Sequence, residues 1–165
     1  MKKVMNLKSL LFCAMLVLTM SLNTVNAQAG ALDYLGHTID GSELTNEMES
    51  IGNYQSVARS TYLHQGFVRI TNNGGGYVGI GAGTECNVTC GTVKLNVYLE
   101  RSSGSEDFYS YKKWENVDYN TSSLYLNQQV KVEKGYYYRL RGYHSCTKNG
   151  VTENGGSRTD GIYIG

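Results

Sequence analysis

The chain has 165 residues, with 15 Lys and Arg against 14 Asp and Glu, and a formal net charge of +1. This length suits one domain with one core, and the near-neutral charge gives no bulk attraction to nucleic acid or to a membrane surface. Fourteen tyrosines, 20 glycines and no proline fit strands joined by turns that use glycine rather than proline. The composition therefore favours a single β-rich domain and argues against a nucleic-acid-binding protein.

Residues 1–27 have the three parts of a secretory signal peptide. Three lysines lie among the first eight residues, an apolar run covers residues 10–20, and residues 25–27 place Val and Ala at the cleavage positions. The apolar run is too short to span a bilayer, which takes about 20 apolar residues. We expect cleavage after Ala27 and an extracellular, secreted product without a membrane span.

Residues 28–58 are polar and acidic, with five carboxylates and no Lys or Arg. They show no sustained strand or helix periodicity, apart from a short helix expected near residues 44–51. We therefore predict an acidic mobile leader over 28–58, followed by the domain at 59–165. Whether this leader is a pro-segment stays open, because its carboxylates could fold over Arg139 and Arg141 until the chain is cut near Arg59.

From about Thr61 onward, short runs with alternating apolar residues are separated by turn-forming clusters rich in Asn, Ser and Gly. The clearest alternation puts Val93, Leu95, Val97 and Leu99 on one face of a strand. Seven such strands predict an all-β domain, an antiparallel seven-stranded Ig/fibronectin III-like sandwich. The expected strands lie near 66–71, 77–83, 93–101, 107–115, 123–132, 136–146 and 159–164, with 151–153 extending the last hairpin.

The segment at residues 135–142 reads GYYYRLRG, and a short strand follows it after a glycine-containing loop. This segment resembles the last hairpin of a fibronectin type III domain, in which a tyrosine near the start of the strand forms the tyrosine corner. Tyr136 is the matching position. The chain also resembles an uncharacterised family of small secreted proteins of Gram-positive bacteria, a domain of unknown function. That second resemblance implies no activity and no site residue; it rests on residues 41–45, 97–101, 136–139 and 161–164.

Three cysteines follow the signal peptide, Cys86, Cys90 and Cys146, and the expected strand order places all three at one end of the sandwich. In a secreted protein we expect one disulfide and one leftover thiol. A bond from Cys86 to Cys146 would close a loop of about 60 residues and contribute roughly 4 kcal/mol by the chain-entropy argument. Pairing of Cys146 with Cys90, or of Cys86 with Cys90, stays open. The leftover thiol also permits a disulfide-linked dimer.

A zinc site is the alternative at this corner, because thiolates and imidazole are preferred zinc ligands. Its ligands would be Cys86, Cys90, His144 and Cys146. The three-residue spacing between the first two cysteines is looser than that of zinc knuckles, and an oxidising exterior competes for the thiols. We therefore expect no bound metal and no cofactor. A nucleophilic Cys146 activated by His144 lacks a third group to orient the imidazole.

One outer sheet face is expected to carry four tyrosines beside two arginines, because the odd positions of the strand at 136–146 point to solvent. Flat rings with hydroxyl groups, flanked by guanidinium groups, suit a sugar ring or a protein partner. The same residues are also common on the outer surface of an ordinary sheet. The candidate ligand-binding residues are Tyr98, Tyr137, Arg139, Arg141, Tyr143 and Tyr163.

The sequence contains no H-E-x-x-H motif, no G-x-S-x-G motif and no glycine-rich phosphate loop. We therefore predict a secreted, non-enzymatic binding module, in the first place for a cell-wall or other extracellular carbohydrate. A protein-interaction or self-associating module that uses the loops at the cysteine end is the first alternative. A small secreted hydrolase is the second, because scattered carboxylates could form a catalytic pair in the folded chain.

Overall fold

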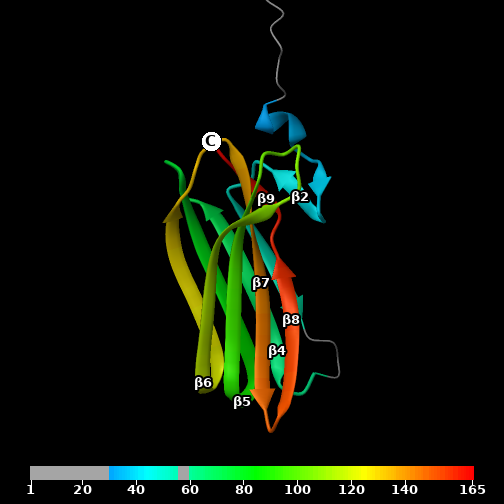
Figure 1. Cartoon of the computed structure of the whole chain (residues 1–165), viewed down its shortest axis with the longest axis vertical. Helices are drawn as coiled ribbons and strands as arrows, with labels where there is room; N and C mark the ends of the chain where they lie inside the picture. The colour runs from blue at the N-terminus through cyan, green and yellow to red at the C-terminus, as the bar shows by residue number, and fades with distance from the viewer. Residues whose placement is uncertain (1–29, 56–59) are drawn as a thin grey trace, which may run out of the picture.

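The computed structural model describes residues 30–55 and 60–165, so the predicted signal peptide and its cleavage point lie outside the described residues. Within these two ranges, no helix is long and apolar enough to cross a membrane. The prediction of an all-β domain is confirmed. The described residues form one 3-10 turn and nine strands (Figure 1), which are η1 (Ala31–Tyr34), β1 (Thr38–Ile39), β2 (Ser42–Thr45), β3 (Glu49–Gln55), β4 (Leu63–Asn72), β5 (Tyr77–Ser102), β6 (Tyr109–Lys131), β7 (Tyr136–Lys148), β8 (Val151–Arg158) and β9 (Gly161–Ile164).

The nine strands form one sheet in the order β1-β2-β9-β7-β5-β4-β3, with β6 paired to β5 and β8 paired to β7. β2 and β9 pair in parallel, with Leu44 beside Gly161 and Thr45 beside Ile162. Every other pairing among the described strands is antiparallel. The predicted antiparallel seven-stranded Ig/fibronectin III-like sandwich is therefore not what forms, because residues 38–55 add three strands and one of them pairs in parallel.

β5 and β6 run on through regions where turn residues predict strand ends, and the sheet curls into a half-barrel (Figure 1). β5 pairs with β6 at both ends of its length, with an irregularity between Glu85 and Cys90. The Thr84 hydroxyl donates a hydrogen bond to the carbonyl of Lys94 at 3.1 Å, so the two arms of β5 fold back toward each other. β6 bends beside this point at Asn120, where φ is 53°. The turn residues around Asn120 therefore bend β6 and do not end it, because β6 stays paired with β5 on both sides of the bend.

The core lies between the two arms of β5. Even positions of the first arm and odd positions of the second are buried, because the irregular segment between the arms changes the alternation. The predicted buried face of Val93, Leu95, Val97 and Leu99 is confirmed. The main core also includes Val68, Ile70, Val78, Ile80, Ala82, Leu126, Val130, Val132, Tyr138, Leu140, Ile162 and Ile164.

Residues 38–55, which the sequence assigns to a mobile leader, are part of the sheet. β3 pairs with β4 along its whole length, and Leu44 of β2 is fully buried. The leader prediction and the short helix predicted over 44–51 are both wrong for this segment. The segment has few apolar residues, so its sequence shows no alternation of apolar and polar positions. One of these residues, Ile51, is 52% exposed and does not mark a buried face. This segment is extended because β2 pairs with β9 and β3 pairs with β4.

Two glycines allow the sheet to close on one side. A Cβ atom at Gly52 of β3 would lie 1.9 Å from the carbonyl oxygen of Arg158 in β8. A Cβ atom at Gly66 of β4 would lie 2.3 Å from Cγ of His144 in β7. No larger residue fits at either position without a shift of the facing strand, so these glycines bring β3 and β4 against β7 and β8.

Candidate functional site

The structure buries two of the six predicted ligand-binding residues. Tyr137 and Arg139 are 0% and 1% exposed, because the chain around η1 and β2 covers the outer face of β7 at this level. The Tyr137 hydroxyl donates a hydrogen bond to the carbonyl of Ala31 at 2.8 Å. Tyr163 is partly buried against the Tyr137 ring, with 5.4 Å between ring centres. The expectation that all six side chains share an open outer face is therefore wrong.

Arg139 is the centre of an ionic network that links the N-terminal strands to the rest of the sheet. Its Nε donates to Glu100 at 2.8 Å, and its Nη1 donates to the Ser42 hydroxyl at 3.0 Å. Its Nη2 donates to Asp40 at 2.5 Å. This hydrogen bond and the Arg139 charge lower the pKa of Asp40 from its ordinary value. Asp40 is thus one carboxylate of the predicted acidic leader that does fold onto Arg139.

Tyr98, Arg141 and Tyr143 remain at the surface, where they line a shallow hollow of about 440 Å³ together with Asn96. Tyr98 of β5 lies opposite Arg141 of β7, and Asn96 lies opposite Tyr143, so cross-strand pairing brings the four side chains together. The Tyr143 residue is 41% exposed and the Arg141 side chain is 56% exposed. The structure therefore keeps three of the six predicted residues in one open site.

The buried carboxylate of Glu100 holds the Arg141 guanidinium group of this hollow in place. Glu100, whose side chain is 4% exposed, has its Oε1 2.9 Å from Nη2 of Arg141 and its Oε2 against Arg139. The Arg141 guanidinium carbon lies 5.6 Å from the centre of the Tyr98 ring, and Nζ of Lys113 lies 5.7 Å from the same ring centre. The hollow thus combines two phenol rings, an amide and a guanidinium group held in place from below.

A second pocket, of about 340 Å³, lies on the outer face of the first arm of β5. Its floor is backbone, because the residues of β5 that point outward here are Gly79, Gly81 and Gly83. β4 and β6 supply the walls. This pocket is not among the sites predicted from the sequence, although glycine at every second position of a strand indicates that one face of the strand carries no side chains. The residues that line it are Phe67, Arg69, Thr71, Asn73, Gly79, Ile80, Gly81, Ala82, Tyr125, Leu126 and Asn127.

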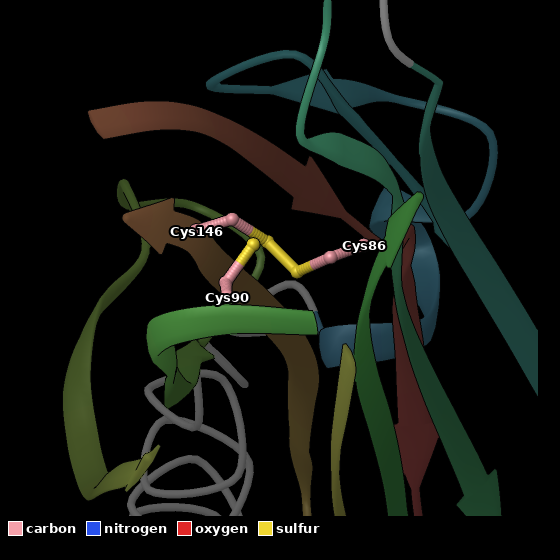
Figure 2. A group of neighbouring side chains, drawn as sticks. All are labelled: Cys86, Cys90 and Cys146. Atoms are coloured by element: carbon pink, nitrogen blue, oxygen red, sulfur yellow. A yellow bond between two sulfur atoms is a disulfide. The ribbon is translucent and has the colours of Figure 1, made fainter. Parts of the chain in front are cut away.

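Figure 2 shows the three described cysteines together at the bend of β5. Cys86 and Cys146 form a disulfide with a Cα–Cα distance of 6.6 Å, which confirms one of the predicted pairings. Cys90 is the free cysteine among the described residues, and its Sγ lies within 4.8 Å of the other two sulfur atoms. It is 1% exposed and donates a hydrogen bond to the carbonyl of Val88 at 3.4 Å. Burial raises the pKa of the Cys90 thiol, and the same burial opposes a disulfide-linked dimer, which a leftover thiol would permit.

His144 does not join the cysteines. Its Nδ1 lies 2.9 Å from the Thr84 hydroxyl and its Nε2 lies 2.7 Å from the Ser157 hydroxyl. Burial lowers the pKa of His144 to about 4, so the ring is neutral at physiological pH. The alternative of a four-ligand zinc set from this histidine and the three cysteines is therefore not assembled, and His144 is not placed to activate Cys146.

Tyr136 does not form the tyrosine corner that the fibronectin resemblance implies. The hydroxyl that bonds back to the upstream chain belongs to Tyr138, which donates to the carbonyl of Glu133 at 2.9 Å. The Tyr136 ring packs instead against Arg101, with the guanidinium carbon 4.3 Å from the ring centre. Arg101 also lies 5.1 Å from the centre of the Tyr111 ring, so this part of β7 faces an aromatic cluster around a cation.

Comparison with known proteins gives a family but no activity. None of the curated proteins compared with the chain matches it. The model of a family of unknown function, DUF6147, matches residues 33–161, from η1 to the start of β9. The match includes β1 to β3, which agrees with their place in the sheet. Because it covers more than half of the sequence, this chain belongs to the family of unknown function DUF6147.

Proposed function

We propose that this protein is a secreted, non-enzymatic module that binds a cell-wall or other extracellular carbohydrate in the hollow between Tyr98, Arg141 and Tyr143. Secretion rests on the signal-peptide pattern of residues 1–27, and the disulfide agrees with an oxidising compartment. The resemblance to Gram-positive secreted proteins makes a bacterial cell wall the first ligand source to test. The observation that carries the proposal is that the exposed Tyr143 and the partly exposed Tyr98 line an open hollow together with one fixed guanidinium group.

The chemistry of the hollow suits a sugar ring, which has an apolar C–H face and a rim of hydroxyl groups. The Tyr143 ring offers an apolar surface, while its hydroxyl, the Asn96 amide and the Arg141 guanidinium offer donors and acceptors. Because Glu100 already holds Arg141, this side chain loses little further freedom when a ligand binds. The same carboxylate offsets the charge of Arg141, which favours a neutral or weakly anionic sugar.

The hydrolase alternative has less support at this hollow. Glycoside hydrolysis uses two carboxyl groups that face the substrate, and none of the described residues that line the hollow is acidic. Glu100 lies beneath it, with a side chain that is 4% exposed and paired with Arg139 and Arg141. Binding without hydrolysis is therefore the function that this geometry supports best.

Retention of the protein on purified cell-wall polysaccharide tests the proposal. We expect Tyr143→Ala to weaken retention by about tenfold or more, because it removes the exposed ring that contacts the sugar. Tyr77→Ala is the matched control, since Tyr77 is 39% exposed but lies on the other arm of β5. Thermal unfolding of both variants checks that the fold is kept. If wild-type protein is retained on no polysaccharide, or if Tyr143→Ala binds as wild type does, the proposal is wrong.

A further inference from the structure

We propose that the pocket on the first arm of β5 is a second ligand-binding site, and that its ligand is a single neutral sugar ring. This inference goes beyond the proposed function, because the pocket shares no residue with the Tyr98 hollow. The core separates the two sites, since the two arms of β5 bury their inner faces against each other. The two sites therefore lie on opposite outer faces of the curled sheet.

The floor of the pocket is flat and open at Gly81. In the register of the sheet, Gly81 lies between Arg69 of β4 and Asn127 of β6. A Cβ atom at this glycine would meet one atom within 4 Å, the Cβ of Arg69 at 3.8 Å. The space above the Gly81 backbone is therefore free, and a flat ring can lie directly on the strand between two polar walls.

Side-chain contacts close the pocket at both ends. At one end, Phe67 and Tyr125 meet with 6.4 Å between ring centres, and a Cβ atom at Gly83 beneath them would lie 2.4 Å from Phe67. At the other end, the Asn73 amide donates a hydrogen bond to Oε1 of Gln129 at 3.3 Å. The pocket is thus a short compartment with an aromatic end and an amide end, which suits one ring rather than an extended chain.

Two carboxylates, Glu85 and Glu49, hold these walls in place before a ligand arrives. The Tyr125 hydroxyl donates to Oε1 of Glu85 at 2.8 Å, and the Gln65 amide donates to the other carboxylate oxygen of Glu85 at 2.6 Å. Nε of Arg69 donates to Oε2 of Glu49 at 2.7 Å. Walls that are fixed in this way lose less side-chain entropy on binding than free side chains do.

The charges at the pocket favour a neutral ligand. Arg69 is the cation among the lining residues, and Glu49 pairs with it through both Nε and Nη2. A carboxylated sugar would have to compete with Glu49 for this guanidinium group, whereas hydroxyl groups can bond to the Asn127 and Asn73 amides and to the Thr71 hydroxyl without displacing it. With an aromatic end for the C–H face, an uncharged sugar ring fits the walls best.

The size of the pocket agrees with a single ring. Its volume of about 340 Å³ lies near the lower end of the range of about 300–1,000 Å³ for small-molecule sites. A small site with few polar contacts gives weak binding, so the test must detect affinities in the millimolar range.

NMR titration of the isotope-labelled full chain provides such a test, with glucose, galactose and N-acetylglucosamine as neutral probes and glucuronate as the charged one. We expect saturable shifts of the backbone amides of Gly79, Gly81 and Asn127 with at least one neutral sugar, and smaller shifts with glucuronate. Gly81→Val should weaken this binding by about tenfold or more, because its side chain fills the compartment where Gly81 has open space. Gly91→Val, the same substitution elsewhere in β5, is the matched control.

The position of the shifts separates the two proposals. Shifts at Gly81 and Asn127 that Gly81→Val removes and Gly91→Val keeps support the second site, whether or not the Tyr98 hollow responds. Shifts at Tyr98 and Tyr143 alone overturn the second site and leave the proposed function standing. Shifts at Gly81 that survive Gly81→Val, or no shifts with any sugar, also overturn it. If Gly81→Val does not fold, Asn127→Ala replaces it, since Asn127 is exposed.

Discussion

At the scale of single residues, several polar groups that look like candidates for chemistry in the sequence serve to hold the fold. Both ring nitrogens of His144 are bonded to hydroxyl groups. Glu153 accepts hydrogen bonds from the Ser60 hydroxyl and from the backbone amides of residues 61–63. Burial opposes the charge of Glu153, but these bonds together lower its pKa to about 2. These side chains therefore direct their hydrogen bonds to other parts of the protein.

His144 makes the stability of the protein depend on pH. Burial lowers its pKa from 6.5 to about 4, so the unfolded chain takes up a proton more readily than the folded one. The stability that the neutral ring provides is complete above about pH 6.5 and is lost as the pH falls toward 4, by about 3 kcal/mol for the whole shift. Between these pH values, the free energy of unfolding of His144→Gln, measured in urea, should change less with pH than that of wild type.

The control for this experiment is His64→Gln, because His64 is exposed on the same sheet. Urea unfolding of the two variants and of wild type at several pH values between about 7 and 4 gives the comparison. If His144→Gln shows the same pH dependence as wild type, the ring is not the group responsible.

At the scale of elements, the bend of β5 is the feature on which the curled sheet depends. Cys86 lies on one side of the bend, and its disulfide partner Cys146 lies near the end of β7. Leu63 and Val93 pack with Cys90 and Cys146 into a small apolar cluster at this point. The bond therefore links the bend to the opposite arm of the sheet, in addition to restricting the unfolded chain.

Removal of the disulfide should lower the free energy of unfolding by roughly 4 kcal/mol, the value expected for a closed loop of about 60 residues. The variant is Cys86→Ala with Cys146→Ala, and the measurement is urea unfolding under non-reducing conditions. Cys90→Ala is the control, because it keeps the bond. In the wild-type chain without residues 1–27, intact mass after alkylation should show one thiol that reacts after unfolding and not before, since Cys90 is buried. A double variant as stable as Cys90→Ala would contradict this account.

At the scale of the whole molecule, the N-terminal strands and the rest of the sheet form one unit. The Ser42 hydroxyl donates a hydrogen bond to the carbonyl of Thr159, 117 residues later in the chain. Arg139, near the start of β7, bonds to both Asp40 and Ser42. These contacts cover the face that the sequence analysis assigned to ligand binding, so the open part of that face is reduced to the Tyr98 hollow.

Replacement of Arg139 by Met should detach the N-terminal strands before the rest of the sheet unfolds. It leaves Glu100 with one cation instead of two, and loss of one partner from a buried ion pair costs about 3 kcal/mol or more. Hydrogen exchange should then become faster in residues 38–45 than in the core of β5. Arg141→Met is the matched control, because its side chain is 56% exposed. Equal exchange in both variants would show that the network does not hold this segment.

Some features of this protein can be derived from its sequence. Alternation in the strand around Val93 to Leu99 predicts a buried face, because that pattern depends only on neighbouring residues and the two-residue period of a strand. The glycine and tyrosine content predicts an all-β fold. The cysteine spacing reduces the disulfide to a few pairings, among them the bond from Cys86 to Cys146.

Other features depend on which segments meet in space. Tyr137 and Arg139 alternate as outward-facing strand residues should, but strands from the N-terminal segment cover them. Whether a face is open depends on contacts between segments about 100 residues apart, which local periodicity does not encode. The same reason applies to the pocket above Gly81, whose walls come from β4 and β6. The sequence thus determined the all-β class and the cysteines from which the cross-link is formed, and the tertiary structure decided which two of them pair and which side chains remain free to bind.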